Sequence, residues 1–241
     1  MRKSRKGTPV TAHSAARVRR VRGSTLREVA YDELRQSLLE GRFAPGEAVT
    51  VAELSGQLGI GLMPTREAVQ QLASRGAFEF LPNRSVRVPV IAGEELASLF
   101  DARFLLEGFA TARAAENITR EELSRVSANL AQLIEHARTR AAAECLAANF
   151  EFHFSIYRAS RSPLVVEMIE HLWLRMSPLH VRVFRASKRD QDDFLSAMPK
   201  HRILVDALRR GDKAKAQTTI NAMLAQSLKW HQRTAPSAAR T

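Results

Sequence analysis

Apolar residues recur at helical spacing along most of the chain, and the first such run predicts a helix over residues 25–40. Ser24 stands at the N-cap position of this helix. The predicted buried stripe consists of Leu26, Val29, Ala30, Leu34 and Leu38. The turn that follows, residues 41–46, contains Phe43, which we expect to anchor it in the core.

Two shorter helices follow, separated by a tight turn. The first spans 51–58, and Gly59 is suited to end it in a left-handed C-cap. The second lies between Pro64 and Gly76, with an apolar face of Ala68, Val69 and Leu72. The opposite side is predicted to present Thr65, Arg66 and Gln70 to a partner. This pattern predicts a helix-turn-helix, whose second helix enters the major groove of DNA.

A short β-hairpin is predicted directly after these helices. Residues 78–81 and 86–88 have strand character, and the turn between them carries Arg84 at its tip. A helix-turn-helix followed by such a hairpin is a winged helix, which is a much more specific signal than the two helices alone.

The rest of the chain is predicted to be helical. Residues 89–93 end the strand pattern and form a linker. Pro178 should kink or divide one of the later helices, and Pro199 should start or bend another. We predict helices at 94–116, 119–139, 142–159, 163–186, 192–210 and 212–232. The predicted fold class is therefore mainly α, with an N-terminal winged helix-turn-helix (23–90) followed by an antiparallel all-α bundle (94–232).

The formal net charge of +12 is unevenly distributed. Residues 1–22 contain eight basic and no acidic side chains, whereas residues 23–90 have a net charge of −1. We interpret 1–22 as a disordered basic arm that adds phosphate contacts, or alternatively as a solubilising extension, and 233–241 as a frayed tail. The lone Cys145 and the lack of a long apolar run predict a cytoplasmic protein without disulfides or a membrane span.

Two N-terminal segments resemble the signature of the GntR family of transcriptional regulators. Residues 41–46 match its Gly-x-x-x-Pro-Gly turn, and residues 60–69 resemble its recognition segment Val-Ser-Arg-Thr-Pro-Val-Arg-Glu-Ala-Leu. Arg66 and Glu67 match, whereas the Ser-Arg pair of the family is replaced by Gly61-Leu62. The resemblance implies a homodimer that binds a palindromic operator in double-stranded DNA.

Two C-terminal segments resemble the subgroup of this family that has an all-helical, effector-binding FCD domain. Residues 101–107 resemble its Arg-x-x-x-Glu helix, in which the arginine commonly points at an acidic effector. Residues 149–153 resemble its Asp-x-x-x-His metal motif with Asn149 in place of the aspartate, and His201 fits a second histidine. The resemblance implies a small carboxylate-type effector bound in the bundle.

The candidate DNA contacts lie on the second helix of the helix-turn-helix and on the hairpin. The Arg66 guanidinium can form two hydrogen bonds to guanine or bind a phosphate, although it could also pair with Glu67 on the surface. Met63 could touch a thymine methyl group or pack under the helix. The complete predicted set is Met63, Thr65, Arg66, Gln70 and Arg84.

The candidate effector contacts are Arg103, Asn149, His153 and His201. A buried arginine needs a partner, which for Arg103 is either Glu107 or a ligand carboxylate. Asn149 and His153 share a helical face, and with His201 they could hold zinc, nickel or manganese. Two imidazoles and a neutral amide make a weak set of metal ligands, so the same residues could instead contact the effector directly.

These observations favour a ligand-responsive transcriptional regulator, a repressor of a metabolic operon, over two alternatives. A non-sensing architectural DNA-binding protein with a degenerate pocket is compatible with Asn149 and with Met223, where the family has a third histidine. A helical-bundle metalloenzyme would also need a positioned general base, and Glu151 faces away from His153. We therefore predict that the chain is not an enzyme.

Overall fold

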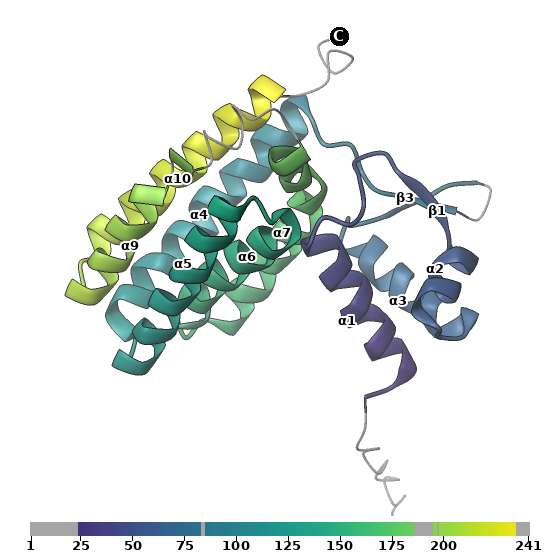
Figure 1. The fold of residues 1–241 in the computed structure, drawn as a ribbon, viewed down its shortest axis with the longest axis horizontal. Coiled ribbons are helices and arrows are strands. Elements are labelled where there is room, and N and C mark those ends of the chain that lie inside the picture. The colour runs from purple at the N-terminus through teal and green to yellow at the C-terminus, as the bar shows by residue number, and fades with distance from the viewer. Residues whose placement is uncertain (1–23, 83–84, 186–194, 197, 235–241) are drawn as a thin grey trace, which may run out of the picture.

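The computed structural model describes residues 24–82, 85–185, 195–196 and 198–234. A winged helix built from α1, α2, α3 and a small sheet lies beside a bundle of longer helices (Figure 1). The mainly α fold class is confirmed. The winged helix contains α1 (Leu26–Leu39), β1 (Ala48–Thr50), α2 (Val51–Leu58), α3 (Leu62–Ser74), β2 (Glu79–Phe80) and β3 (Ser85–Arg87).

Local capping explains where the first helices begin. Thr25 caps α1, not Ser24, because its hydroxyl accepts a hydrogen bond from the backbone N–H of Glu28, whose carboxylate bonds back to the N–H of Thr25. Thr50 and Glu53 form the same reciprocal pair at the start of α2. Gly59 ends α2 with φ of 64°, the left-handed conformation that its sequence position predicts.

The sheet contains a strand that the sequence did not predict. The order is β1-β3-β2, and both pairings are antiparallel, with Val49 opposite Val86 and Phe80 opposite Val86. Three residues are too few to show an alternating pattern, so β1 could not be recognised before its partner β3 was placed beside it. The hairpin tip, including Arg84, lies outside the described residues.

The bundle follows the predicted helices closely. Pro178 lies within α7 but does not divide it. A proline cannot donate to the carbonyl four residues earlier, and here the Ser177 hydroxyl donates to that carbonyl, Leu174 O, at 2.8 Å. The helices are α4 (Gly93–Asn117), α5 (Arg120–Thr139), α6 (Ala142–Arg158), α7 (Pro163–Arg185), α9 (Met198–Arg210) and α10 (Lys213–Thr234). None of the helices in the described ranges is long and apolar enough to cross a membrane.

The apolar core is continuous from the winged helix into the bundle. Phe43 is buried as predicted and meets Phe78 edge to face, with ring centroids 5.7 Å apart. The predicted stripe on α1 is wrong at its N-terminal end, because Leu26 and Val29 are 61% and 37% exposed. The buried residues of α1 begin at Ala30, and α3 and α7 are among the elements that pack against this helix.

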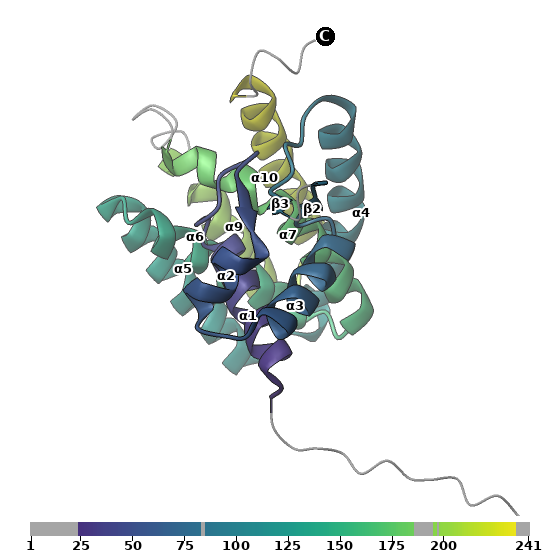
Figure 2. The same cartoon turned by 90° about the vertical axis from the view of Figure 1, so that its right-hand side faces the viewer.

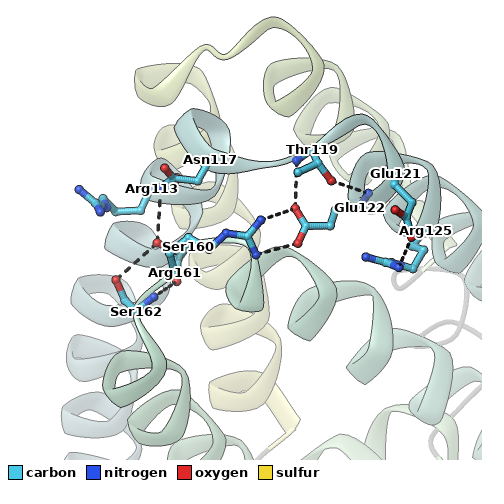
Figure 3. Close-up of polar contacts among 9 residues, drawn as sticks. All are labelled: Arg113, Asn117, Thr119, Glu121, Glu122, Arg125, Ser160, Arg161 and Ser162. Atoms are coloured by element: carbon cyan, nitrogen blue, oxygen red, sulfur yellow. Dashed lines mark hydrogen bonds and ion pairs between the residues drawn. The ribbon is translucent and has the colours of Figure 1, made fainter.

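The loops at one end of the bundle are clamped by a pair of hydrogen bonds between Arg161 and Glu122 (Figure 3). The Arg161 atoms Nη1 and Nη2 each donate to one carboxylate oxygen of Glu122, at 2.7 and 2.8 Å. Glu122 also accepts from the backbone N–H of Thr119 at 2.9 Å. These contacts lower the pKa of Glu122 to about 2. The hydrogen bonds from Arg161 have the largest effect, and the hydrogen bond from the backbone N–H of Thr119 has the next largest.

The clamp predicts a pH-dependent contribution to stability. Because the folded pKa of Glu122 lies below its unfolded value, the contribution is fully present above about pH 4.5 and is lost as the pH falls toward about 2. We expect Glu122→Gln to lower the unfolding free energy by about 1–2 kcal/mol at pH 7, since solvent partly screens Arg161. Urea unfolding at pH 7, 4 and 3 should show this difference shrinking with acidity.

The matched control is Glu121→Gln, at the position next to Glu122. It removes an exposed ion pair with Arg125 and should lower the unfolding free energy by less than about 0.5 kcal/mol. Equal unfolding free energies for wild type and Glu122→Gln at pH 7 would contradict the stabilising role of the clamp.

Candidate functional site

The exposed face of α3 carries most of the predicted DNA contacts. Met63, Arg66 and Gln70 are exposed and lie three and four residues apart, so their side chains project from one side of the helix. Ala68, Val69 and Leu72 are buried on the opposite side as predicted. In Figure 2, α2 and α3 lie in front of the bundle, which leaves this face open to a large partner.

Thr65 does not belong to that face, and the prediction that it does is wrong. Its side chain is fully buried, and its hydroxyl donates to the carbonyl of Gly61 at 3.0 Å. The helix begins at Leu62, two residues earlier than Pro64 predicts, so Thr65 lies in its first full turn. Back-bonding to the carbonyl four residues earlier satisfies the hydroxyl inside the helix-turn-helix. Thr65 therefore fixes the turn and does not reach a base.

The N-terminus of α3 has no side-chain cap. Gly61 is the N-cap residue and offers no acceptor to the first backbone N–H groups of the helix. Uncapped N–H groups at a helix N-terminus favour an anionic partner.

The buried carboxylate of Glu107, on α4, links this helix to α6 and α7. Glu107 accepts hydrogen bonds from three side chains on these elements: Arg103 Nε at 2.6 Å, Trp173 Nε1 at 3.1 Å and Tyr157 Oη at 2.5 Å. Burial, followed by the negative charge of Glu107, raises the pKa of Tyr157 well above its usual range. The phenol therefore stays protonated and remains a donor to Glu107.

Arg103 is buried and only partly satisfied. Its Nε donates to Glu107, and its guanidinium carbon lies 4.9 Å from the Phe100 ring centroid and 5.4 Å from that of Trp173. Within the part of the chain that the structure describes, its Nη1 is buried without a hydrogen-bond partner. Of the two roles that the sequence left open, pairing with Glu107 is realised, and a donor remains that an incoming carboxylate could accept from.

The histidines border this cluster. His153 Nδ1 lies 3.3 Å from the Tyr157 hydroxyl, and because the phenolic proton is committed to Glu107, the imidazole is the donor in this contact. The His153 and His201 rings lie 5.7 Å apart, centroid to centroid. Asn149 is half-buried one turn before His153 on α6. The structure thus brings His153 and His201 next to the Glu107 cluster, which consists of Arg103, Glu107, Tyr157 and Trp173.

The residues present do not fit a divalent metal ion in the way that the resemblance implies. In the described part of the chain, no three His, Cys, Asp or Glu side chains form a group that could hold one. Asn149, His153 and His201 supply only two imidazoles and a neutral amide, which is a weak set of metal ligands. We therefore assign these side chains no metal chemistry.

Sequence reasoning missed Tyr157 and Trp173. Tyr157 follows Asn149 and His153 at a further interval of four residues, so helical spacing alone could have placed it on the same face. Trp173 carries no such signal, because only the packing of α7 against α4 brings its indole to Glu107.

The outer face of α7 contacts the winged helix. Arg35 on α1 donates to Glu170 at 3.0 Å, and Arg75 after α3 lies 4.0 Å from Glu167 and bonds to Tyr31. A Cβ at Gly76, where φ is 72°, would lie 3.3 Å from the side chain of Arg175. One helix thus touches the Glu107 cluster, α1 and the C-terminal end of α3.

Comparison with known proteins places both halves of the chain. Residues 26–88 match the model described as bacterial regulatory proteins, gntR family, and residues 98–226 match the FCD domain. The chain belongs to the GntR family. The resemblance found in the sequence is confirmed, and this GntR regulator has a winged helix-turn-helix followed by an FCD domain.

The relatives of this GntR protein are transcriptional regulators and not enzymes. The HTH-type transcriptional regulator McbR of Escherichia coli (strain K12) is 28% identical over 201 residues, covering 82% of this chain and 88% of McbR. A solved structure of E. coli McbR/YncC superposes with a TM-score of 0.83 at 26% identity, over 89% of this chain and 100% of that chain. A probable D-xylose utilization operon transcriptional repressor of Paenarthrobacter nicotinovorans is 28% identical over 201 residues, 83% of this chain and 85% of that protein.

The buried cluster of this GntR protein generates a test of its energetics. Glu107→Met removes the acceptor of three donors and leaves the Arg103 charge buried, so we expect it to lower the unfolding free energy by about 3–5 kcal/mol. Arg103→Met combined with Glu107→Met removes both charges and should be less destabilised than Glu107→Met alone. Urea unfolding of the two single variants and the double variant measures this coupling; additive losses would show that the pair does not act as a unit.

Proposed function

We propose that this protein is a ligand-responsive repressor of a metabolic operon, which binds a palindromic operator as a homodimer and senses a small carboxylate in its FCD domain. Family membership already makes it a DNA-binding transcriptional regulator. The homodimer, the operator symmetry and the carboxylate are the parts that we add.

The exposed stripe of α3 supports the DNA-reading half of the proposal. Arg66 and Gln70 supply side chains that can each form two hydrogen bonds to a purine edge in the major groove. The uncapped N-terminus of α3 can receive a phosphate. Arg84 on the hairpin remains a predicted contact to the minor groove or the DNA backbone, and the basic arm of residues 1–22 remains a predicted phosphate contact; both lie outside the described residues.

An apolar surface supports the homodimer. Leu105 and Phe109 are exposed on α4, four residues apart and on the side opposite to Arg103 and Glu107. We propose that these two side chains belong to the surface that a second copy of the chain covers. A two-fold dimer formed through the bundle would present two α3 helices to successive half-sites.

The orphan Nη1 of Arg103 is the observation that carries the sensing half. A buried donor without an acceptor is costly, and a ligand carboxylate would satisfy it with a charge-assisted hydrogen bond. His153 and His201 lie close enough to the cluster to complete a polar pocket around such a ligand. The ligand would act through direct contacts with these side chains.

The position of α7 explains how a ligand could change DNA affinity. Trp173 contacts Glu107 on the inner face of α7, and Glu170, three residues earlier, pairs with Arg35 on α1. A ligand that draws Arg103 away from Glu107 would release part of the restraint on Trp173. The orientation of the winged helix on α7 then responds, and by linkage the ligand must bind free and DNA-bound protein with different affinities.

We expect Arg66→Ala to weaken binding to the DNA sequence that wild type selects from a random duplex pool, by about 1–3 kcal/mol per half-site, because a guanidinium contact is lost. Fluorescence anisotropy at fixed salt measures the affinity. Arg138→Ala removes an exposed arginine on α5, changes the net charge equally, and should bind within about twofold of wild type. Equal losses in both variants would mean that Arg66 acts only through charge.

We expect Arg103→Met to abolish the thermal stabilisation of wild type by carboxylates, because the guanidinium is the proposed hydrogen-bond donor and counter-charge for the ligand carboxylate. A panel of acetate, succinate, citrate and benzoate, with the corresponding amides as uncharged controls, supplies the probes. Stabilisation of the variant by the same carboxylate as wild type would refute the role of Arg103.

Glu170→Gln serves as the complementary variant. It weakens the α7–α1 contact without touching the cluster, so the active carboxylate should bind as before but change DNA affinity by a smaller factor. Glu135→Gln on α5 is its matched control. No response of wild type to any carboxylate would favour the architectural alternative.

A further inference from the structure

The first turn of α3 exposes two large apolar side chains where the other exposed side chains are polar. Met63 is 63% exposed and Leu62 is 48% exposed. Met63 lies three residues before Arg66 and seven before Gln70, which places it at the N-terminal end of the same stripe. An exposed apolar side chain on a DNA-reading face is costly in free protein unless a partner covers it.

Two glycines precede this exposed first turn of α3, and open space surrounds them among the residues that the structure describes. Gly59 and Gly61 precede the helix, and a Cβ at Gly59 would meet nothing within 4 Å. A Cβ at Gly61 would meet only the ring of Pro64, with its nearest atom at 3.8 Å. Because Gly59 and Gly61 have no side chains, the N-terminal turn of α3 can enter a groove far enough for Leu62 and Met63 to contact its floor.

The major groove contains one apolar group that such side chains can recognise. Every base pair presents hydrogen-bonding groups there, but only thymine adds a methyl group, at C5. Arg66 and Gln70 suit the polar edges of purines, whereas Met63 has no donor and only a weak thioether acceptor. Its unbranched side chain adapts its shape to an apolar contact.

We propose that Met63, flanked by Leu62, reads the C5-methyl group of thymine, so that each operator half-site contains a thymine beneath the first turn of α3. This inference rests on the proposed DNA-reading role of α3 and adds the chemical feature that this turn recognises. It also gives a consequence to the Gly61-Leu62 pair that replaces the Ser-Arg pair of the family segment: a charged donor is exchanged for apolar surface. The first turn thereby selects for thymine through its methyl group.

Deoxyuridine tests this directly, because it differs from thymidine only by the missing methyl group. The probe is the duplex that full-length wild type selects from a random pool, with each thymine of a half-site replaced in turn by deoxyuridine. At the contacted thymine we expect about fourfold weaker binding, and on the order of tenfold when both half-sites are substituted. Other thymines should tolerate the replacement.

Variants then assign the methyl contact. Met63→Ala should bind the thymine duplex more weakly and lose its discrimination between thymine and deoxyuridine at that position, while Leu62→Ala should reduce the discrimination in part. Both residues are exposed, so folding should be preserved, which the unfolding midpoint checks. Met168→Ala, an exposed methionine on α7, should keep full discrimination.

The outcomes separate this inference from the function on which it rests. Deoxyuridine duplexes that all bind as tightly as the thymine duplex would overturn methyl recognition while leaving DNA reading intact. Discrimination that persists in both Met63→Ala and Leu62→Ala would overturn the assignment to this turn. A pool in which wild type enriches no sequence would overturn the proposed function, and methyl recognition with it.

Discussion

The buried carboxylate of Glu107 is the interaction on which the rest of the bundle depends. It accepts hydrogen bonds from Arg103 on its own helix, from Tyr157 on α6 and from Trp173 on α7, so one side chain fixes three helices relative to each other. A charge in an apolar core is tolerated only when its lone pairs are occupied and a counter-charge lies nearby. Glu107 meets both conditions, whereas Arg103 keeps an unsatisfied donor. This imbalance is the basis of our proposal that the cluster binds a ligand carboxylate.

The same arrangement joins the buried cluster to the winged helix, because α7 contacts both. Trp173 faces the cluster, while Glu167 and Glu170 face Arg75 and Arg35 of the winged helix. The core is continuous across this boundary, so a shift of α7 cannot be absorbed by an empty linker. The proposed communication needs no long pathway, since Glu170 and Trp173 lie one turn apart on the same helix.

Within the winged helix, α3 divides its residues between building the domain and contacting DNA. The Thr65 hydroxyl donates a hydrogen bond to the Gly61 carbonyl, and its side chain is buried in the turn. Ala68, Val69 and Leu72 form the buried face. The residues left exposed are Met63, Arg66 and Gln70. Because Gly59 and Gly61 contribute no side chains ahead of them, the reading surface begins at the very start of the helix.

The helices, the winged helix-turn-helix and the family could be predicted from the amino-acid sequence, because helical periodicity, capping residues and motif spacing are local properties. The same motifs indicated that Arg103, His153 and His201 belong to one site. The sequence could not determine β1, whose three residues gain strand character only from pairing with β3. The prediction for Thr65 was wrong although the spacing could have corrected it, because Thr65 lies three and four residues before Ala68 and Val69 and therefore shares their buried face. Only the tertiary structure brought Trp173 to Glu107 and Arg35 to Glu170, since these contacts join residues 66 and 135 positions apart along the chain.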